Sequence, residues 1–230
     1  MAKEIFESQE KMKDFLLTLS KMYNISYSNL LLLKNQRKDV SFILHKEKLK
    51  DYGLSVKDAE QPLKVIKRIK SEDKAKFIID EVYDVSQTNA VKKKDKTYNN
   101  EYVETMLKGM CARRGLEFIP NSQIENIENI ISDIKENCRA GNPSKYSIDE
   151  YAKQTMLEIN ATVFTICKRL NINTRNYNLK DLCTWGVEKD SRTIKESLKY
   201  IQKFTNYFVK DFQIQEKIQK IEKENQEEME

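Results

Sequence analysis

The side chains best suited to chemistry gather in the first third of the chain, where aromatic and amide residues alternate with basic ones. Aromatic rings can stack on unpaired bases and basic side chains can neutralise phosphates, but composition and spacing alone indicate only a basic, soluble, mostly helical protein. The aromatic candidates are Tyr23, Tyr27 and Phe42. The candidates for phosphate contact are Lys34, Arg37, Lys38, Lys46, Lys48, Lys50, Lys57, Lys64, Lys67 and Arg68.

The net charge of +5 is unevenly distributed along the 230 residues. Residues 1–100 hold 21 Lys and Arg against 15 Asp and Glu, whereas residues 101–230 hold 20 against 21. A local positive excess favours phosphate binding, because the bound phosphates release their counterions. A solvated lysine-rich surface would have the same composition, so charge alone leaves both interpretations open.

The totals exclude several classes of protein. No run of about 18 apolar residues occurs, so we expect no membrane span, and the charged N-terminus lacks the apolar core of a signal peptide. A cytoplasmic location follows. Four cysteines with long gaps are typical of reduced core thiols in such a compartment: Cys111, Cys138, Cys167 and Cys183.

Apolar periodicity predicts an α+β first half, in which helices lead into a small antiparallel sheet. Ser26 stands at the N-cap position of the second helix, and Gly53 stands where the third helix should end. A turn is expected at residues 71–73. The expected elements are, in order, helix 12–23, helix 27–35, strand 39–44, helix 46–52, strand 63–69 and strand 75–85.

The second half is predicted to be almost entirely helical, with a capping box at Ser147 opening its longest helix. The run Lys92–Lys96 predicts a linker, or alternatively a basic loop that contacts nucleic acid. The tail contains only isoleucines among Lys, Glu and Gln, which is typical of a solvated helix or an interaction arm. The predicted divisions are 1–90, a linker at 91–100, a helical domain at 101–212 and a charged helical tail at 213–230.

Several short motifs follow one another over about 75 residues. An aromatic-Asn-x-Ser-x-x-Asn run spans Tyr23 to Asn29, and Gln36 follows seven residues later. Gly53 comes next, and the run Tyr83-Asp84-Val85-Ser86-Gln87-Thr88 ends the series. In order and spacing, these motifs resemble the N-terminal single-stranded-DNA-binding domain of ArdC-type antirestriction proteins, which plasmids, conjugative elements and phages carry.

The resemblance implies a set of DNA contacts: Tyr23, Ser26, Tyr27, Asn29, Gln36, Arg37, Lys38, Lys46, Lys48, Lys57, Lys64, Lys67 and Arg68. Structural roles stay open for some of them, because Tyr23 fits the helix stripe, Ser26 fits a helix cap, and both amides can satisfy backbone groups. The chain departs from the family at two places. Asp58-Ala59 replaces the usual Lys-Gly of a turn, and a residue near Leu49 replaces a tryptophan.

Residues from about Gln123 onward resemble the metallopeptidase-like half that often follows this domain. In that family the two histidines of an H-E-x-x-H helix bind zinc and the glutamate activates water. Here the matching register reads Ser132-Asp133-Ile134-Lys135-Glu136, and the single histidine, His45, lies in the other half. We therefore expect a degenerate site without a metal or other cofactor, whose vestigial positions are Ser132, Asp133, Glu136 and Glu158. A hard cation held by carboxylate oxygens is the alternative.

The leading hypothesis is a non-enzymatic, cytoplasmic protein of a phage or conjugative element that binds single-stranded DNA and protects it from host defence. The second is a protein inhibitor that binds a host restriction or CRISPR nuclease directly. The third is a residual metal-dependent hydrolase. The expected fold is α+β: N-terminal helices and a small antiparallel sheet, followed by a mostly helical, degenerate metallopeptidase-like region. The sequence leaves strand preference, host target and oligomeric state open.

Overall fold

The computed structural model describes residues 2–69, 76–90, 97–137 and 148–227 of the chain. These residues form a mostly helical protein with one three-stranded antiparallel sheet, which confirms the predicted fold class. The turn expected at 71–73, the run Lys92–Lys96, Cys138 and the cap at Ser147 lie outside the described residues. The contacts divide the chain into two compact units, one of residues Lys21–Asp95 and one of residues Ala2–Ser20 with Lys96–Glu230. The functional boundaries at residues 90, 100 and 212 stay predictions.

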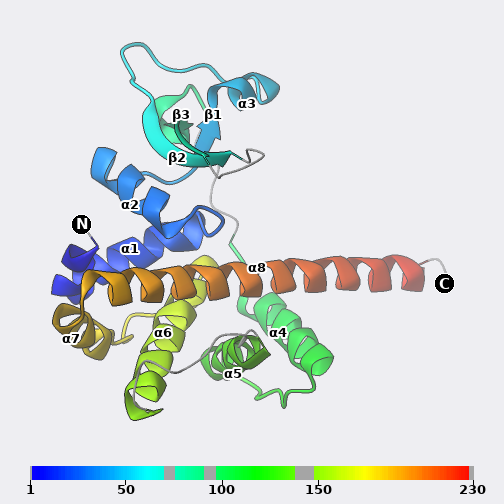
Figure 1. The fold of residues 1–230 in the computed structure, drawn as a ribbon. Helices are drawn as coiled ribbons and strands as arrows, with labels where there is room; N and C mark the ends of the chain where they lie inside the picture. Colours follow the sequence, from blue (N-terminus) through cyan, green and yellow to red (C-terminus); the bar gives the residue numbers. More distant parts are fainter. Residues whose placement is uncertain (1, 70–75, 91–96, 138–147, 228–230) are drawn as a thin grey trace. The chain divides into compact units, whose positions relative to one another are not determined.

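The first unit is built on the sheet, whose strand order is β1-β3-β2 (Figure 1). Its buried side chains include Leu33, Leu49, Leu63, Val65 and Val82. The central strand β3 pairs with the whole of β2 through its residues 76–82 and with β1 through its residues 82–84. The elements are α2 (Tyr27–Gln36), β1 (Ile43–His45), α3 (Lys46–Asp51), β2 (Leu63–Ile69), β3 (Lys76–Asp84) and the 3₁₀ turn η2 (Val85–Gln87).

The strand predicted over residues 39–44 is wrong in its first part, because β1 begins only at Ile43. The backbone N–H groups of Ser41 and Phe42 donate to the Asp84 carboxylate, at 2.7 and 2.9 Å, rather than to a neighbouring strand. A side chain from far along the sequence therefore shortens this strand. The predicted strand 63–69 is confirmed with the same bounds.

Two left-handed residues shape the segment between α3 and β2. Gly53 follows α3 with a φ of 65°, as the predicted helix end requires. Ala59 has a φ of 66°, a conformation that costs an L-residue with a side chain about 1–2 kcal/mol. The turn that contains Ala59 therefore carries backbone strain that a glycine would avoid.

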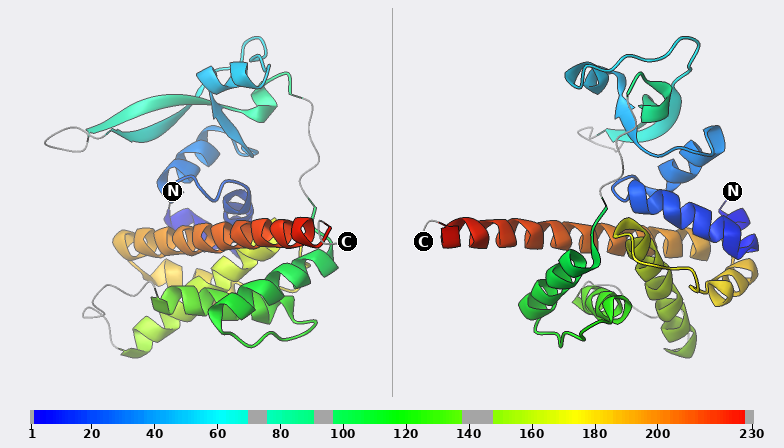
Figure 2. Two further views of the ribbon diagram at one scale, coloured as in Figure 1. Left: turned by 90° about the vertical axis from the view of Figure 1, so that its right-hand side faces the viewer. Right: turned by 180° about the vertical axis from the view of Figure 1, so that it is seen from behind.

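The second unit is a helical bundle in which the long helix α8 crosses α4, α5 and α6 (Figures 1 and 2). Its core is one apolar cluster that includes Met106, Ile130, Ile134, Ile166 and Phe208. The isoleucine stripe predicted for α5 faces this cluster. The elements are the 3₁₀ helix η1 (Lys3–Glu7), α1 (Gln9–Lys21), α4 (Asn100–Arg114), α5 (Gln123–Asn137), α6 (Ile148–Arg169), α7 (Lys180–Glu188) and α8 (Ser191–Glu227).

The first residues of the chain belong to this bundle, because η1 packs on α7 (Figure 1). The rings of Phe6 and Trp185 lie 6.3 Å apart between centroids. Gly186 permits this packing, since a Cβ at that position would lie 1.9 Å from Phe6. Residues 3–7 and 180–188 are thus joined within one unit.

Three of the predicted core thiols are confirmed as free and buried, namely Cys111, Cys167 and Cys183. Burial raises the pKa of the Cys167 thiol to about 12, so this group stays protonated and unreactive at neutral pH. Among the described residues, no helix combines the length and the apolar character that a membrane crossing requires.

Candidate nucleic-acid interface

Two amide side chains of α2 bind the backbone of the edge strand β2. Asn29 Oδ1 accepts from the N–H of Ile66 and Asn29 Nδ2 donates to its carbonyl, both at 2.8 Å. Gln36 bonds Lys64 in the same way, at 2.8 and 2.9 Å. An edge strand has unpaired backbone groups, and these two side chains satisfy four of them. The roles of Asn29 and Gln36 in DNA contact stay a prediction, whereas their structural role is visible.

The run from Tyr83 to Thr88, which ends the motif series, forms a network of hydrogen bonds next to the sheet. Besides accepting from Ser41 and Phe42, the buried Asp84 carboxylate accepts from the N–H of Ser86 at 2.9 Å. Gln87 Oε1 accepts from the N–H of Asp84 at 2.8 Å. Burial works to raise the pKa of Asp84, but the hydrogen bonds from Ser86, Ser41 and Phe42 outweigh it and hold that pKa below its ordinary value. The signature therefore holds the sheet together.

Other predicted contacts also have partners within the first unit. Ser26 is confirmed as the N-cap of α2, with its Oγ accepting from the N–H of Asn29 at 3.3 Å. Tyr23 and Tyr27 are half-buried. The engaged basic side chains are Arg37 with Glu60 at 3.3 Å, Lys48 with Asp51 at 3.0 Å, Lys57 with the Ser86 carbonyl at 2.9 Å, and Lys67 with Asp80 at 3.1 Å.

Four predicted contacts are exposed cations without a hydrogen-bond or ion-pair partner for the side chain in the described part of the chain: Lys38, Lys46, Lys64 and Arg68. Two of them, Lys64 and Arg68, lie on one face of β2, since side chains of a strand alternate between its faces. Lys67 lies on the opposite face, where it meets Asp80. The predicted cations of β2 therefore lie on two opposite faces of the strand.

The face of Lys64 and Arg68 also carries exposed apolar side chains. The β2–β3 register places Lys64, Ile66 and Arg68 opposite Glu81, Ile79 and Phe77, and these six residues are called the hairpin face below. Phe77 is 68% exposed and Ile79 is 71% exposed. An exposed ring directly opposite an arginine combines a stacking surface with a positive charge, which is the chemistry that unpaired bases and phosphates require.

Sequence reasoning missed Phe77 and Ile79. The signal was present, because Phe77-Ile78-Ile79 is an uninterrupted apolar run, whereas a strand with one solvated face alternates apolar and polar residues. The run predicts a strand but does not show which of its side chains are exposed. Only the pairing with β2 brings Phe77 to Arg68.

In the second unit, a buried ion pair lies beside the vestigial metal positions. Lys135 Nζ is 3.0 Å from Glu158 Oε2, and both side chains are nearly inaccessible to solvent. Glu158 Oε1 also accepts from Gln154 Nε2 at 2.8 Å. The Lys135 ammonium lies 5.5 Å from the centroid of the Phe204 ring on α8. Both oxygens of Glu158 are therefore satisfied within the protein.

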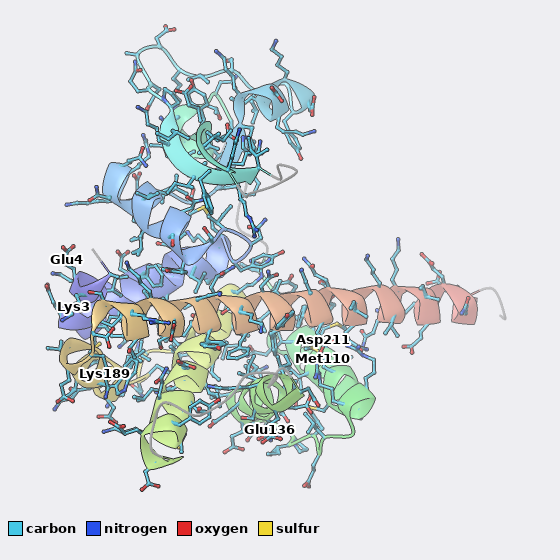
Figure 3. All side chains as sticks on the ribbon, viewed as in Figure 1. Lys3, Glu4, Met110, Glu136, Lys189 and Asp211 are labelled. Carbon is cyan, nitrogen blue, oxygen red and sulfur yellow. The ribbon has the colours of Figure 1, made fainter. Side chains whose placement is uncertain are left out.

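The remaining vestigial positions do not meet Glu158. Asp133 pairs with Arg114 and accepts from Asn137 at 2.9 Å, and the exposed Glu136 lies on the outer side of α5 (Figure 3). Ser132 is half-buried. Among the described residues, no group of three or more His, Cys, Asp and Glu side chains has the arrangement of a metal site.

The sheet unit and the helical unit together match the fold of a solved structure. The structure is similar to the Mn(II)-bound crystal structure of the antirestriction protein ArdC from plasmid R388, with a TM-score of 0.50 and 11% sequence identity. The match covers 81% of this chain and 84% of that chain. The metal-free ArdC structure gives a TM-score of 0.47 at 12% identity.

By sequence, no protein-family model and no curated protein matches the chain. At 11% identity the structural likeness shows the fold alone, and at that level it confirms the resemblance predicted from the motifs. The fold is ArdC-like over most of the chain.

The manganese of that ArdC crystal structure prompts a test of the residues present here. A divalent cation needs carboxylate or imidazole groups with free lone pairs. Glu158 is bonded to an ammonium and an amide, and Asp133 is bonded to a guanidinium. These residues do not fit a metal ion, because a cation would have to displace positive groups that already neutralise them.

Proposed function

We propose that this chain is a non-enzymatic antirestriction protein that binds single-stranded DNA on the hairpin face of its first unit. The observation that carries the proposal is Phe77, an exposed ring opposite the unpaired Arg68 in an ArdC-like fold. Bases stack on Phe77 and the neighbouring apolar side chains, while Arg68 and Lys64 neutralise phosphates. Lys38 and Lys46 add positive charge from the same unit.

The second unit supports this role without hydrolysis. The pairing of Lys135 with Glu158 neutralises the carboxylate charge that would attract a catalytic metal. The sequence also lacks the two histidines of a zinc peptidase helix, since its one histidine is His45. We therefore assign the helical unit a structural or interaction role.

The test is fluorescence anisotropy of a labelled oligonucleotide over a salt series. Phe77→Ala should weaken binding about 5- to 150-fold, which corresponds to about 1–3 kcal/mol for one stacked base. Arg68→Ala should lower affinity and reduce the slope of log K against log salt by about 0.7. Tyr52→Ala is a matched control, because Tyr52 is an equally exposed ring in the same unit but outside the hairpin face. Equal effects of Phe77→Ala and Tyr52→Ala would contradict the assignment.

A second candidate function rests on the apolar character of the same face. Ile66, Phe77 and Ile79 together would also suit a protein partner, such as the host nuclease that a direct inhibitor binds. The two functions give opposite results with a purified host nuclease. Stoichiometric binding that is lost in Ile79→Lys, with no affinity for oligonucleotides, would favour the inhibitor.

A further inference from the structure

The helix α8 carries exposed apolar side chains at a constant spacing of seven residues. Tyr200, Tyr207, Ile214 and Ile221 are between 41% and 54% exposed. A seven-residue repeat returns to nearly the same side of a helix, with the small drift that two supercoiled helices accommodate. Ile218 lies four residues after Ile214 and three before Ile221, which completes the alternating spacing of a coiled-coil seam. These five residues are called the α8 stripe.

The last part of α8 extends past α4 (Figures 1 and 2). Its final side-chain bonds to another element join Gln215 to Arg113 at 2.7 Å and Glu216 to Tyr102 at 2.9 Å. From residue 217 to 227, the described side chains make a single ion pair, between Lys220 and Glu224 of the same helix. A helix of this length is only marginally stable in water without tertiary packing. Exposed isoleucines on such an arm indicate a missing partner.

The charges of the arm indicate which partner fits. Lys217 and Lys220 make its first half positive, whereas Glu222, Glu224 and Glu227 outnumber Lys223 and make its second half negative. Two copies that run antiparallel place the lysines of one beside the glutamates of the other, and their helix dipoles also oppose. Two parallel copies would place like charges side by side.

We propose that Ile214, Ile218 and Ile221, the last three residues of the α8 stripe, form the seam of an antiparallel homodimer, in which the arm of one chain pairs with the arm of a second copy. Ile218 of one copy packs near Ile221 of the other around a two-fold axis, so each contact occurs twice. In this register Ile214 lies near Asn225 of the other copy. The dimer requires nothing of the hairpin face and is independent of DNA binding.

The first test is sedimentation equilibrium of the full chain over a concentration series. The parent should convert from monomer to dimer, and the double variant Ile214→Lys/Ile221→Lys should stay monomeric at every concentration. The matched control is Met156→Lys/Val187→Lys, which changes two exposed apolar residues of the same unit outside the stripe. A monomeric parent, or a dimer that survives the stripe variant, overturns the proposal.

A charge-reversal cycle keeps the proposal testable if the stripe variant folds poorly. Lys217→Glu and Glu224→Lys should each weaken the dimer, and together they should restore it. Failure of the double reversal to restore association overturns the predicted charge pairing.

The orientation is tested by disulfide crosslinking under mild oxidation. Asn225→Cys should not crosslink with itself in an antiparallel pair, because the two copies lie about 16 Å apart along the axis at a rise of 1.5 Å per residue. It should crosslink when mixed with Ile214→Cys. Efficient crosslinking of Asn225→Cys alone indicates a parallel pair and overturns the orientation. The chain without added cysteines controls for its own thiols.

Discussion

The buried carboxylates of the two units have different partners. In the first unit, Asp84 accepts from the backbone N–H groups of Ser41 and Phe42, which are distant in the sequence. In the second, Glu158 bonds Lys135, and Asp211 on the side of α8 near α4 bonds two arginines of that helix (Figure 3). Backbone partners hold distant segments in place, whereas an ion pair neutralises the charge of the carboxylate.

Because of this difference, the family resemblance has different consequences for the two units. The signature of the first unit is mostly scaffold, so its presence indicates the fold more directly than it indicates the DNA contacts. The hairpin face, which the signature does not include, has the chemistry for a ligand. In the second unit, Lys135 neutralises Glu158, one of the positions that the resemblance assigns to the degenerate site.

The largest expected effect is on the buried ion pair. Lys135→Ala should lower the unfolding free energy of the second unit by about 3–5 kcal/mol, because it leaves the buried Glu158 charge without its partner. Urea unfolding followed by the fluorescence of Trp185, the single tryptophan, reports this unit.

The control is Lys108→Ala, which removes an exposed lysine of α4 and should change stability by less than about 0.5 kcal/mol. Lys135→Met/Glu158→Leu should recover most of the loss, since both charges are then absent. If Lys135→Ala proves as mild as Lys108→Ala, the ion pair does not stabilise the second unit.

A smaller effect is expected at the base of the sheet. Asp84→Asn should cost about 1–3 kcal/mol, because an amide NH₂ replaces an oxygen that accepts two backbone N–H bonds. Amide hydrogen exchange of β3 measures the stability of this unit.

The pKa shift of Asp84 determines how its contribution to folding stability changes with pH. Its folded pKa is lowered, so the stabilisation is present above the unfolded pKa of about 3.9 and is lost as pH falls through the folded value. The difference between parent and Asp84→Asn should therefore shrink on acidification. A constant difference down to acid pH would show that the charge of Asp84 is not what stabilises the sheet.

The smallest expected effect distinguishes scaffold from ligand contact at α2. Asn29→Ala should speed exchange of the Ile66 amide by about 5- to 30-fold, which corresponds to a loss of about 1–2 kcal/mol from two hydrogen bonds. Oligonucleotide affinity should stay unchanged. Asn35→Ala, at an exposed position of the same helix, should alter neither quantity. A drop in affinity with unchanged Ile66 exchange would assign Asn29 to DNA contact instead.

Local signals in the sequence predicted helices and strands, but not which distant residues contact one another. Ser26 predicted its helix cap and residues 63–69 their strand, because both depend on neighbours in the chain. The start of β1 was misplaced because Asp84, some forty residues away, takes its backbone partners. At the vestigial site, Lys135 rather than Glu136 faces Glu158, a change of one residue or about 100° around the helix.

The sequence by itself determined the order of helices and strands, the ArdC-like signature and the absence of the histidine pair. These follow from residue type, short-range periodicity and spacing. Only the tertiary structure decided that Asn29 and Gln36 bond the backbone of an edge strand and that Phe77 lies beside Arg68. It also decided that the side chains of the α8 stripe are exposed. Those facts depend on strand register and helix rotation, which packing between distant segments fixes and no local pattern encodes.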